Sequence, residues 1–400
     1  LDNATVEDTH IAASATLPWG DSLSALAPKP IGLDTLLQHA GLEVRAEAAD
    51  AAILHHTADL MGDPLELALA SVQASAEPGA ALTVRGEVAF NGKQHSVSLQ
   101  GEPLAALAQR PAGPWQDLSI EVRGEAIRLD ASGSVARPLE IAGFDVGYAL
   151  SGPDIAMLLP LQGAWSLTGR YADQPDRHVF DALKATLGGS DIGGRIVFQP
   201  GDAQPRLVAS LDSGWINLDA FMPGNARQTT AGDRLDQMLD LDGLAAIDLD
   251  VELRFRHLEG LAKPVQDILL TAKAGRQRLA LTPARATVEG VQLDAQAELP
   301  WGDRLTALGR NGISVQQLVQ HTDLALRAKA PPGKLQHEIA LMGHQMNLEL
   351  ARVEAVAPPG KAIRLTAGAR LNDIPVQVSL QADPLAELLQ RPEGPWQDLA

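Results

Sequence analysis

The sequence predicts an all-β protein with a few short helices, built on a long antiparallel sheet. Three observations predict this fold. Apolar and polar residues alternate along many short segments, turn-forming residues recur roughly every 10–14 positions, and stretches with helical spacing last only about two turns. The chain has 400 residues, of which 45% are hydrophobic, so it can bury a sizeable apolar surface.

The clearest strand is the segment Ile247–Arg256, in which five apolar residues alternate with five charged ones. A period of two places the apolar side chains on one face of a strand and the charged side chains on the other. We therefore expect one face of this strand to lie in an apolar environment. The residues expected to face water are Asp248, Asp250, Glu252, Arg254 and Arg256.

Similar alternation predicts further strands, and Asn91-Gly92 between two of them is typical of a hairpin turn. These segments are 65–69, 82–90, 97–99, 196–198, 207–211, 279–281 and 376–380. We predict that apolar residues of this phase line one continuous surface that binds lipid. The predicted lining residues are Leu82, Val84, Val88, Phe90, Ile196, Phe198, Leu207, Leu211, Ile247, Leu249, Val251, Leu253, Phe255, Leu279 and Leu281.

Four short segments carry apolar residues at helical spacing instead. They are Leu33–His39, Pro103–Gln109, Asp233–Leu239 and Pro384–Gln390. Each is too short to be stable alone, so we expect these helices to pack on a sheet edge as caps or lids.

A sheet of this length, roughly 25–30 strands, cannot stay flat because it would expose a continuous apolar face. It must split into stacked sandwiches, close into barrels, or curl so that the apolar face lines an interior. Aromatic residues make up only 4% of the chain. A surface of Leu, Val, Ile and Ala with few rings suits a groove that holds flexible hydrocarbon.

The chain also repeats itself. Leu17–Asp21 recurs as Leu299–Asp303, an offset of 282, and Gly101–Leu118 aligns with Ala382–Leu399 at an offset of 281. We therefore predict one repeat unit over residues 1–282 and the start of a second, homologous unit over residues 283–400. Because the second unit stops partway, we expect this chain to be an internal fragment of a longer protein.

Charge and composition exclude several classes of function. The formal net charge is −18, and no basic patch is present to neutralise phosphates, so we expect no nucleic-acid partner. The absence of cysteine excludes disulfides, thiolate metal sites and a cysteine nucleophile. No stretch approaches the roughly 18 consecutive apolar residues that span a bilayer.

No motif predicts catalysis, a metal or a cofactor, so we expect a protein that is not an enzyme. Gly189–Arg195 is rich in glycine but lacks the Lys and Ser/Thr of a phosphate loop, and predicts a strand junction. His55 and His56 face opposite sides of a strand. His337 and His344 do not have the helical spacing of a zinc site.

The order of segments resembles the AsmA family of bacterial envelope proteins along essentially the whole chain. The densest stretch runs from Gly113 to Phe221. It contains the steps Leu187–Gly194 and Pro205–Phe221, and a later stretch spans Gly243–Gly290.

This resemblance implies an elongated, U-shaped β-groove with an apolar interior and a polar exterior. It also implies a periplasmic protein, anchored to the inner membrane of a Gram-negative bacterium by an N-terminal helix that this chain lacks. The implied partners are phospholipid acyl chains and outer-membrane or periplasmic proteins.

Two functions follow from the resemblance. The first is a lipid-transport groove that takes part in outer-membrane biogenesis by carrying phospholipid between the two membranes. The second is a structural scaffold for outer-membrane proteins that conducts no lipid. A conduit needs an unobstructed apolar lining, whereas a scaffold would fill its interior with large side chains or helices.

Overall fold

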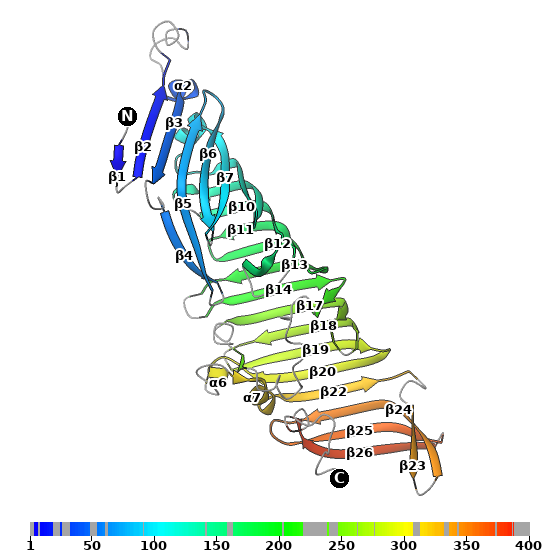
Figure 1. The fold of residues 1–400 in the computed structure, drawn as a ribbon. Helices are drawn as coiled ribbons and strands as arrows, with labels where there is room; N and C mark the ends of the chain where they lie inside the picture. The colour runs from blue at the N-terminus through cyan, green and yellow to red at the C-terminus, as the bar shows by residue number, and fades with distance from the viewer. Residues whose placement is uncertain are drawn as a thin grey trace. The chain divides into compact units, whose positions relative to one another are not determined.

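The computed structural model describes most of the chain, and it divides into two compact units, Leu1–Gly188 and Gly189–Ala400. The described residues are 4–6, 9–18, 25, 33–48, 54–60, 63–90, 92–140, 142–157, 163–201, 204–218, 238–239, 247–261, 263–275, 277–306, 313–331, 336–341, 344–372, 374–385 and 387. They are almost entirely β-strand, as the alternating pattern predicts (Figure 1).

The first unit is an antiparallel sheet in which most neighbouring strands are also neighbours in sequence. Its strands are β1 (Ala4–Val6), β2 (Thr9–Thr16), β3 (Gly41–Ala48), β4 (Leu54–Leu60), β5 (Asp63–Ala76), β6 (Ala81–Phe90), β7 (Lys93–Pro103), β8 (Trp115–Gly124), β9 (Arg128–Arg137), β10 (Ala142–Gly152), β11 (Trp165–Gln174) and β12 (Arg177–Leu187). The long strand β5 pairs with β4 through its first half and with β3 through its second half.

The described helices of this unit are short and connect strands. They are α2 (Leu33–Gln38), α3 (Leu104–Gln109), η1 (Pro138–Glu140) and η2 (Ile155–Met157). Helix α2 contacts α3, and Ala105 and Leu107 of α3 are buried. The two segments that the sequence predicts as helices in this unit are therefore helical and pack together.

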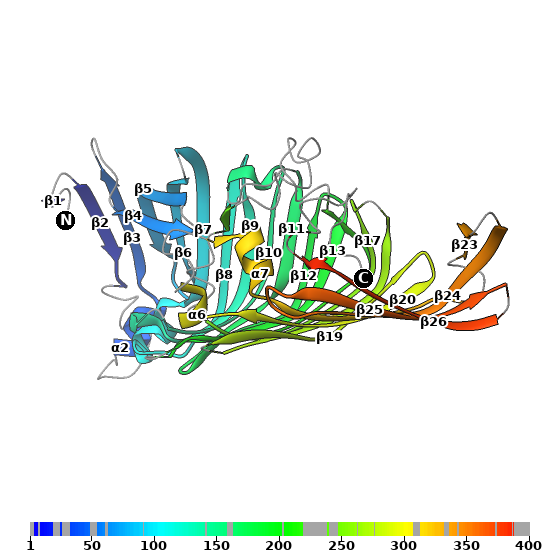
Figure 2. The same ribbon diagram turned by 90° about the horizontal axis from the view of Figure 1, so that it is seen from below.

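The second unit is likewise built mainly of β-strands, with a few short helices. Its strands are β13 (Ser190–Gln199), β14 (Arg206–Ser213), β15 (Ile216–Asn217), β16 (Met238–Leu239), β17 (Asp248–Glu259), β18 (Val265–Ala274), β19 (Arg278–Val288), β20 (Val291–Pro300), β21 (Ile313–Ser314), β22 (Asp323–Lys329), β23 (Gln336–Leu341), β24 (His344–Ala357), β25 (Ala362–Leu371) and β26 (Ile374–Pro384), with helices α6 (Asp303–Thr306) and α7 (Val315–Gln320). Strands such as β19 and β20 bend along their length, so this sheet is curled (Figure 2).

Local sequence explains both the strands and their bending. Along β20, half-buried and exposed residues alternate at nearly every position, which matches its apolar–polar alternation. The ladders between β18, β19 and β20 contain register shifts, and such β-bulges increase local twist and bend a sheet.

The sheet is antiparallel as predicted, with a local exception at β17. Strands β14 and β17 pair in parallel, with Ala209 opposite Val251, and β15 extends the parallel pairing to β17. A parallel pair requires a crossover connection between the two strands. The strands described within that connection are β15 and β16, and β16 pairs with β21.

Two of the predicted helices need correction or fall partly outside the described residues. The end of the predicted helix Asp233–Leu239 is strand β16, and its remaining residues lie outside the described part of the chain. Most of Pro384–Gln390 also lies outside it. Conversely, α6 and α7 are helices that the spacing analysis missed.

The internal repeat reappears as matching strands. Strands β5, β6 and β7 have 14, 10 and 11 residues, and β24, β25 and β26 have the same three lengths. The pair Leu42 and Ala76 corresponds to Leu324 and Ala357. The compact units nevertheless divide after Gly188 and not after residue 282, so the division into repeat units remains a proposal that the matching strands support.

Candidate functional site

Apolar side chains of the second unit form rows that cross the strands in register. One row passes through Val251 and contains residues from eight strands. Its members, in order of pairing, are Ile196, Ala209, Val251, Ala272, Leu281, Ala297, Leu324 and Ala357. Directly paired residues share one face of a sheet, so this row is a continuous apolar band.

Adjacent rows on the same face widen this band. One contains Phe198, Leu207 and Leu249, and continues through Ala274 and Leu279. Another pairs Leu211 with Leu253 and then with Leu270. We call this surface the apolar face of the second unit.

The fifteen lining residues predicted from the sequence all lie on or beside strands and are all half-buried. Four of them lie on β6 in the first unit, and the other eleven lie on or beside β13, β14, β17 and β19 in the second. The second-unit residues that pair across strands therefore belong to one surface. The sequence pattern missed the alanines that connect them, because a single alanine gives little hydrophobic signal.

Half-burial distinguishes these residues from a close-packed core. Side chains in the interior of a domain are usually almost fully buried. Val251 and its paired neighbours keep part of their surface accessible, with the exception of the buried Ala209 and Ala357. The apolar face therefore retains accessible hydrocarbon surface along its rows.

One end of this face is covered by a small hydrophobic cluster. Trp301, which precedes α6, and Leu305 of α6 are 5% and 3% exposed and pack with Ala274. Leu249, Leu279 and Leu318 pack against the same cluster. The short helices α6 and α7 thus cover the end of the row that contains Leu249. The sequence predicts short helices that act as lids, but it predicts them at other segments of the chain.

The first unit has an apolar face of the same kind. One of its rows runs through nine strands and consists of Ala13, Val44, Ala74, Val84, Leu99, Ile120, Ala131, Tyr148 and Gly169. Aromatic rings on this face cover glycines of neighbouring strands. A Cβ on Gly124 would lie 2.0 Å from the His95 ring, so the glycine provides the space for that buried ring.

The opposite face of the second unit carries paired charges. The Asp250 carboxylate forms ion pairs with Lys273 and Arg206. Arg285 of β19 forms another with Asp294 of β20, in which Arg285 Nε lies 3.0 Å from Asp294 Oδ1. Arg254 and Arg256 are exposed as predicted, whereas Asp248, Asp250 and Glu252 are half-buried among these neighbours. Exposed pairs of this kind contribute little to stability and keep the face polar.

The glycine-rich segment Gly189–Arg195, which the sequence predicts to be a strand junction, forms a strand junction in the structure. Gly189 forms the turn before β13 with a φ of +85°, and the next residue but one, Asp191, caps a neighbouring bend. Its carboxylate accepts hydrogen bonds from the backbone of Gly214 at 3.0 Å and Trp215 at 2.7 Å, and from the Ser213 hydroxyl.

We predict an acid-sensitive contribution to stability from Asp191. The hydrogen bonds from the backbone of Gly214 and Trp215 and from the Ser213 hydroxyl hold the pKa of this carboxyl below its ordinary value. The stabilisation is therefore present above the unfolded-state pKa, about 3.9, and is lost as pH falls through the lower folded-state pKa. Asp191→Asn should cost less than about 1 kcal/mol at pH 7, because solvent screens this exposed carboxylate, and the cost should shrink towards pH 2, measured by urea unfolding with tryptophan fluorescence.

The matched control for this prediction is Asp212→Asn, at an exposed aspartate of the same unit. An equal loss of stability in both variants at pH 7 would contradict the role of Asp191 as a cap.

Within the described residues, no group of three or more His, Asp or Glu side chains is arranged to hold a metal ion. No helix among them is long and apolar enough to cross a membrane. His56 and His337 lie on β4 and β23, and His344 begins β24.

Comparison with known proteins gives one distant relative. The sequence is 24% identical over 259 residues to AsmA family protein YhjG of Escherichia coli (strain K12), and the match covers 54% of this chain and 38% of that protein. The chain therefore spans less than half the length of this relative. No family model and no solved structure matches the chain. The match agrees with the family resemblance at the level of distant similarity.

Proposed function

We propose that this chain is part of a periplasmic lipid-transport protein that carries phospholipid between the inner and outer membranes. In this proposal the apolar faces bind acyl chains, and a preceding segment of the parent protein anchors it to the inner membrane. The chain acts without catalysis, metal or cofactor. The distant similarity to an AsmA family protein supports the envelope setting.

The observation that carries the proposal is the row of apolar residues through Val251, which crosses eight strands in register. Each buried methylene is worth about 0.8 kcal/mol, so a chain of 16 carbons gains on the order of 12 kcal/mol over water. A bilayer offers most of the same gain. A uniform apolar face therefore exchanges lipid with a membrane at little net free-energy cost.

The hydrophobic cluster around Trp301 covers one end of the apolar rows. This observation favours a second candidate function, a scaffold for outer-membrane proteins. Trp301, Leu305 and Leu318 occupy apolar surface near Leu249 that a lipid chain would otherwise contact. A conduit requires that the rows beyond this cluster stay open. A scaffold requires that a protein partner covers them.

Mass spectrometry of the purified protein tests the proposal directly. We expect phospholipid to copurify with the protein expressed in a Gram-negative bacterium, and delipidated protein to take up phospholipid from vesicles. Protein that carries no phospholipid and takes none up from vesicles, while remaining folded by circular dichroism, would leave the scaffold as the better candidate.

A further inference from the structure

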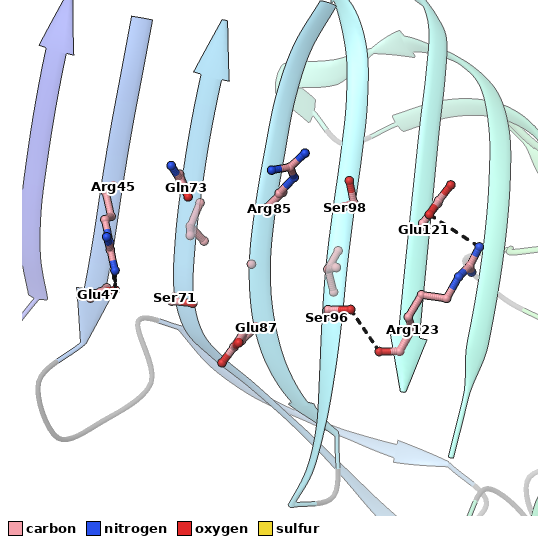
Figure 3. Close-up of a pocket in the computed structure, with 13 residues that line it drawn as sticks. Arg45, Glu47, Ser71, Gln73, Arg85, Glu87, Ser96, Ser98, Glu121 and Arg123 are labelled. Carbon is pink, nitrogen blue, oxygen red and sulfur yellow. Dashed lines mark hydrogen bonds and ion pairs between the residues drawn. The ribbon is translucent and has the colours of Figure 1, made fainter. Parts of the chain in front are cut away.

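The polar face of the first unit contains a hollow of about 440 Å³ that the proposed lipid function does not use. Figure 3 shows its side chains projecting from the strands. The hollow lies on β3, β5, β6, β7 and β8. The lining residues are Arg45, Glu47, Ser71, Val72, Gln73, Arg85, Gly86, Glu87, Ser96, Val97, Ser98, Glu121 and Arg123.

Strand register arranges the polar residues in two rows. The first row consists of Arg45, Gln73, Arg85, Ser98 and Glu121. The second, one step along each strand, consists of Glu47, Ser71, Glu87, Ser96 and Arg123. Strands with an Arg and a Glu therefore alternate with strands that offer only hydroxyl or amide groups.

The two outer arginines of the hollow are already paired. The Arg45 Nε donates to Glu47 at 2.9 Å, and Arg123 contacts Asp130 and Glu121. The central strand β6 differs. Among the described residues, the side chains of Arg85 and Glu87 have no hydrogen-bond or ion-pair partner, and both residues are exposed.

The backbone at the centre of the hollow requires glycine. Gly86 stands between Arg85 and Glu87, and a Cβ there would lie 2.7 Å from the backbone oxygen of Ser71. The ladder between β5 and β6 has a register shift at this point, which draws the two backbones together. Because strand side chains alternate, that Cβ would point to the opposite face, towards Leu69 and Val72, so the close approach fixes the backbone beneath the hollow. On the hollow side of this backbone stand the Arg85 and Glu87 side chains, neither of which has a partner among the described residues.

The Cα atoms of Arg85 and Glu87 lie about 6.6 Å apart along β6, and residues i and i+2 of a strand share a face, so both side chains stand on the hollow side. Guanidinium binds phosphate through two parallel hydrogen bonds, and carboxylate accepts from an ammonium group. Ser98 and Gln73 stand beside Arg85, and Ser71 and Ser96 stand beside Glu87, so each charge has further hydrogen-bonding groups next to it.

We propose that this hollow binds a small zwitterion in which a phosphate and an ammonium group are joined by a short alkyl link. The phosphate contacts Arg85 and the ammonium contacts Glu87. A simple anion is disfavoured, because Glu87 faces it and the chain carries a net charge of −18. The proposal does not rest on lipid transport, since the hollow lies on the face opposite the apolar rows.

The second copy of the repeat provides a natural comparison. At an offset of 281, Arg85 and Glu87 correspond to Thr366 and Gly368 on β25. That copy has lost both charges of the central strand, so we expect no equivalent binding there.

Titration of the protein with O-phosphoethanolamine, followed by nuclear magnetic resonance at low ionic strength, tests the proposal. We expect saturable binding that is at least tenfold tighter than binding of inorganic phosphate or ethanolamine alone. Arg85→Gln should weaken it at least tenfold, and Glu87→Gln should remove the preference over phosphate. Arg364→Gln, at an exposed arginine of β25, is the matched control and should leave binding unchanged.

A vesicle experiment identifies the source of the ligand. If the zwitterion is a lipid headgroup, sedimentation with vesicles of phosphatidylethanolamine and phosphatidylglycerol should exceed that with phosphatidylglycerol alone, and Arg85→Gln should abolish the excess. Binding of the free compound without this excess assigns a soluble ligand. The proposal is overturned if neither probe binds, if phosphate binds as tightly, or if Arg364→Gln weakens binding as much as Arg85→Gln.

Discussion

Replacing Val251 with aspartate is expected to reduce copurifying phospholipid at least tenfold. Val251 is the third residue of the eight-strand apolar row, between Ala209 and Ala272. A carboxylate there must lose water against hydrocarbon or become protonated. Because the side chain is half-buried and not enclosed, water can reach the new charge, and the loss of stability should stay near 1–3 kcal/mol.

The neighbouring residue Glu252 supplies the control, because it lies on the opposite face and contacts Arg254. Glu252→Val should leave lipid binding nearly unchanged. A photocrosslinking amino acid should give lipid adducts at position 251 and none at position 252. Equal labelling at both positions, or none at 251 in protein that carries lipid, would show that the faces or the function are assigned wrongly.

Strand formation was largely predictable because it depends on local alternation. The segment predicted as the clearest strand is β17, which begins at Asp248 and continues to Glu259, a few residues further than the pattern indicates. Its apolar residues pair mainly with apolar residues of β14 and β18, and its charged residues pair mainly with polar ones. Because side chains alternate between the two faces of a strand, the sequence alone determines which residues share a face. Most of the candidate lining residues could therefore be identified from the sequence.

Strand direction was not predictable from the same pattern. Alternation is identical whether a strand runs parallel or antiparallel to its neighbour, so the parallel pair of β14 and β17 left no local signal. Their connection is long enough for a crossover, and that length was the available clue. The helix α7 could have been found through the repeat, since Val315–Gln320 is the counterpart of α2 at an offset of 282.

The polar hollow was invisible in the sequence for a different reason. Its two rows collect residues from Arg45 to Arg123, and only the register of five strands places them side by side. Taken singly, each of these residues matches a solvated strand face. Tertiary pairing of the strands therefore creates the site.

Trp301→Ala is expected to destabilise the second unit by about 3–5 kcal/mol, the usual range for removing a buried tryptophan. Its side chain is 5% exposed and packs with Leu305 and Ala274. The indole Nε1 is buried without a hydrogen-bond partner in the described structure, so Trp301→Phe should cost clearly less than Trp301→Ala. Urea unfolding followed by circular dichroism measures both, and equal costs for the two variants would contradict this packing.

The same pair of variants separates the two proposed functions. Trp301→Ala exposes Leu249 and Leu279, which lengthens the accessible part of their row. If the apolar face conducts lipid, the folded fraction of Trp301→Ala should bind at least as much phospholipid as the wild-type protein, because the cluster only limits access to the row ends. If the cluster instead forms part of a protein-binding scaffold, the variant should bind no lipid and lose its protein partners, and Trp301→Phe should retain them. Loss of lipid from Trp301→Ala under conditions where it is fully folded would therefore count against a conduit.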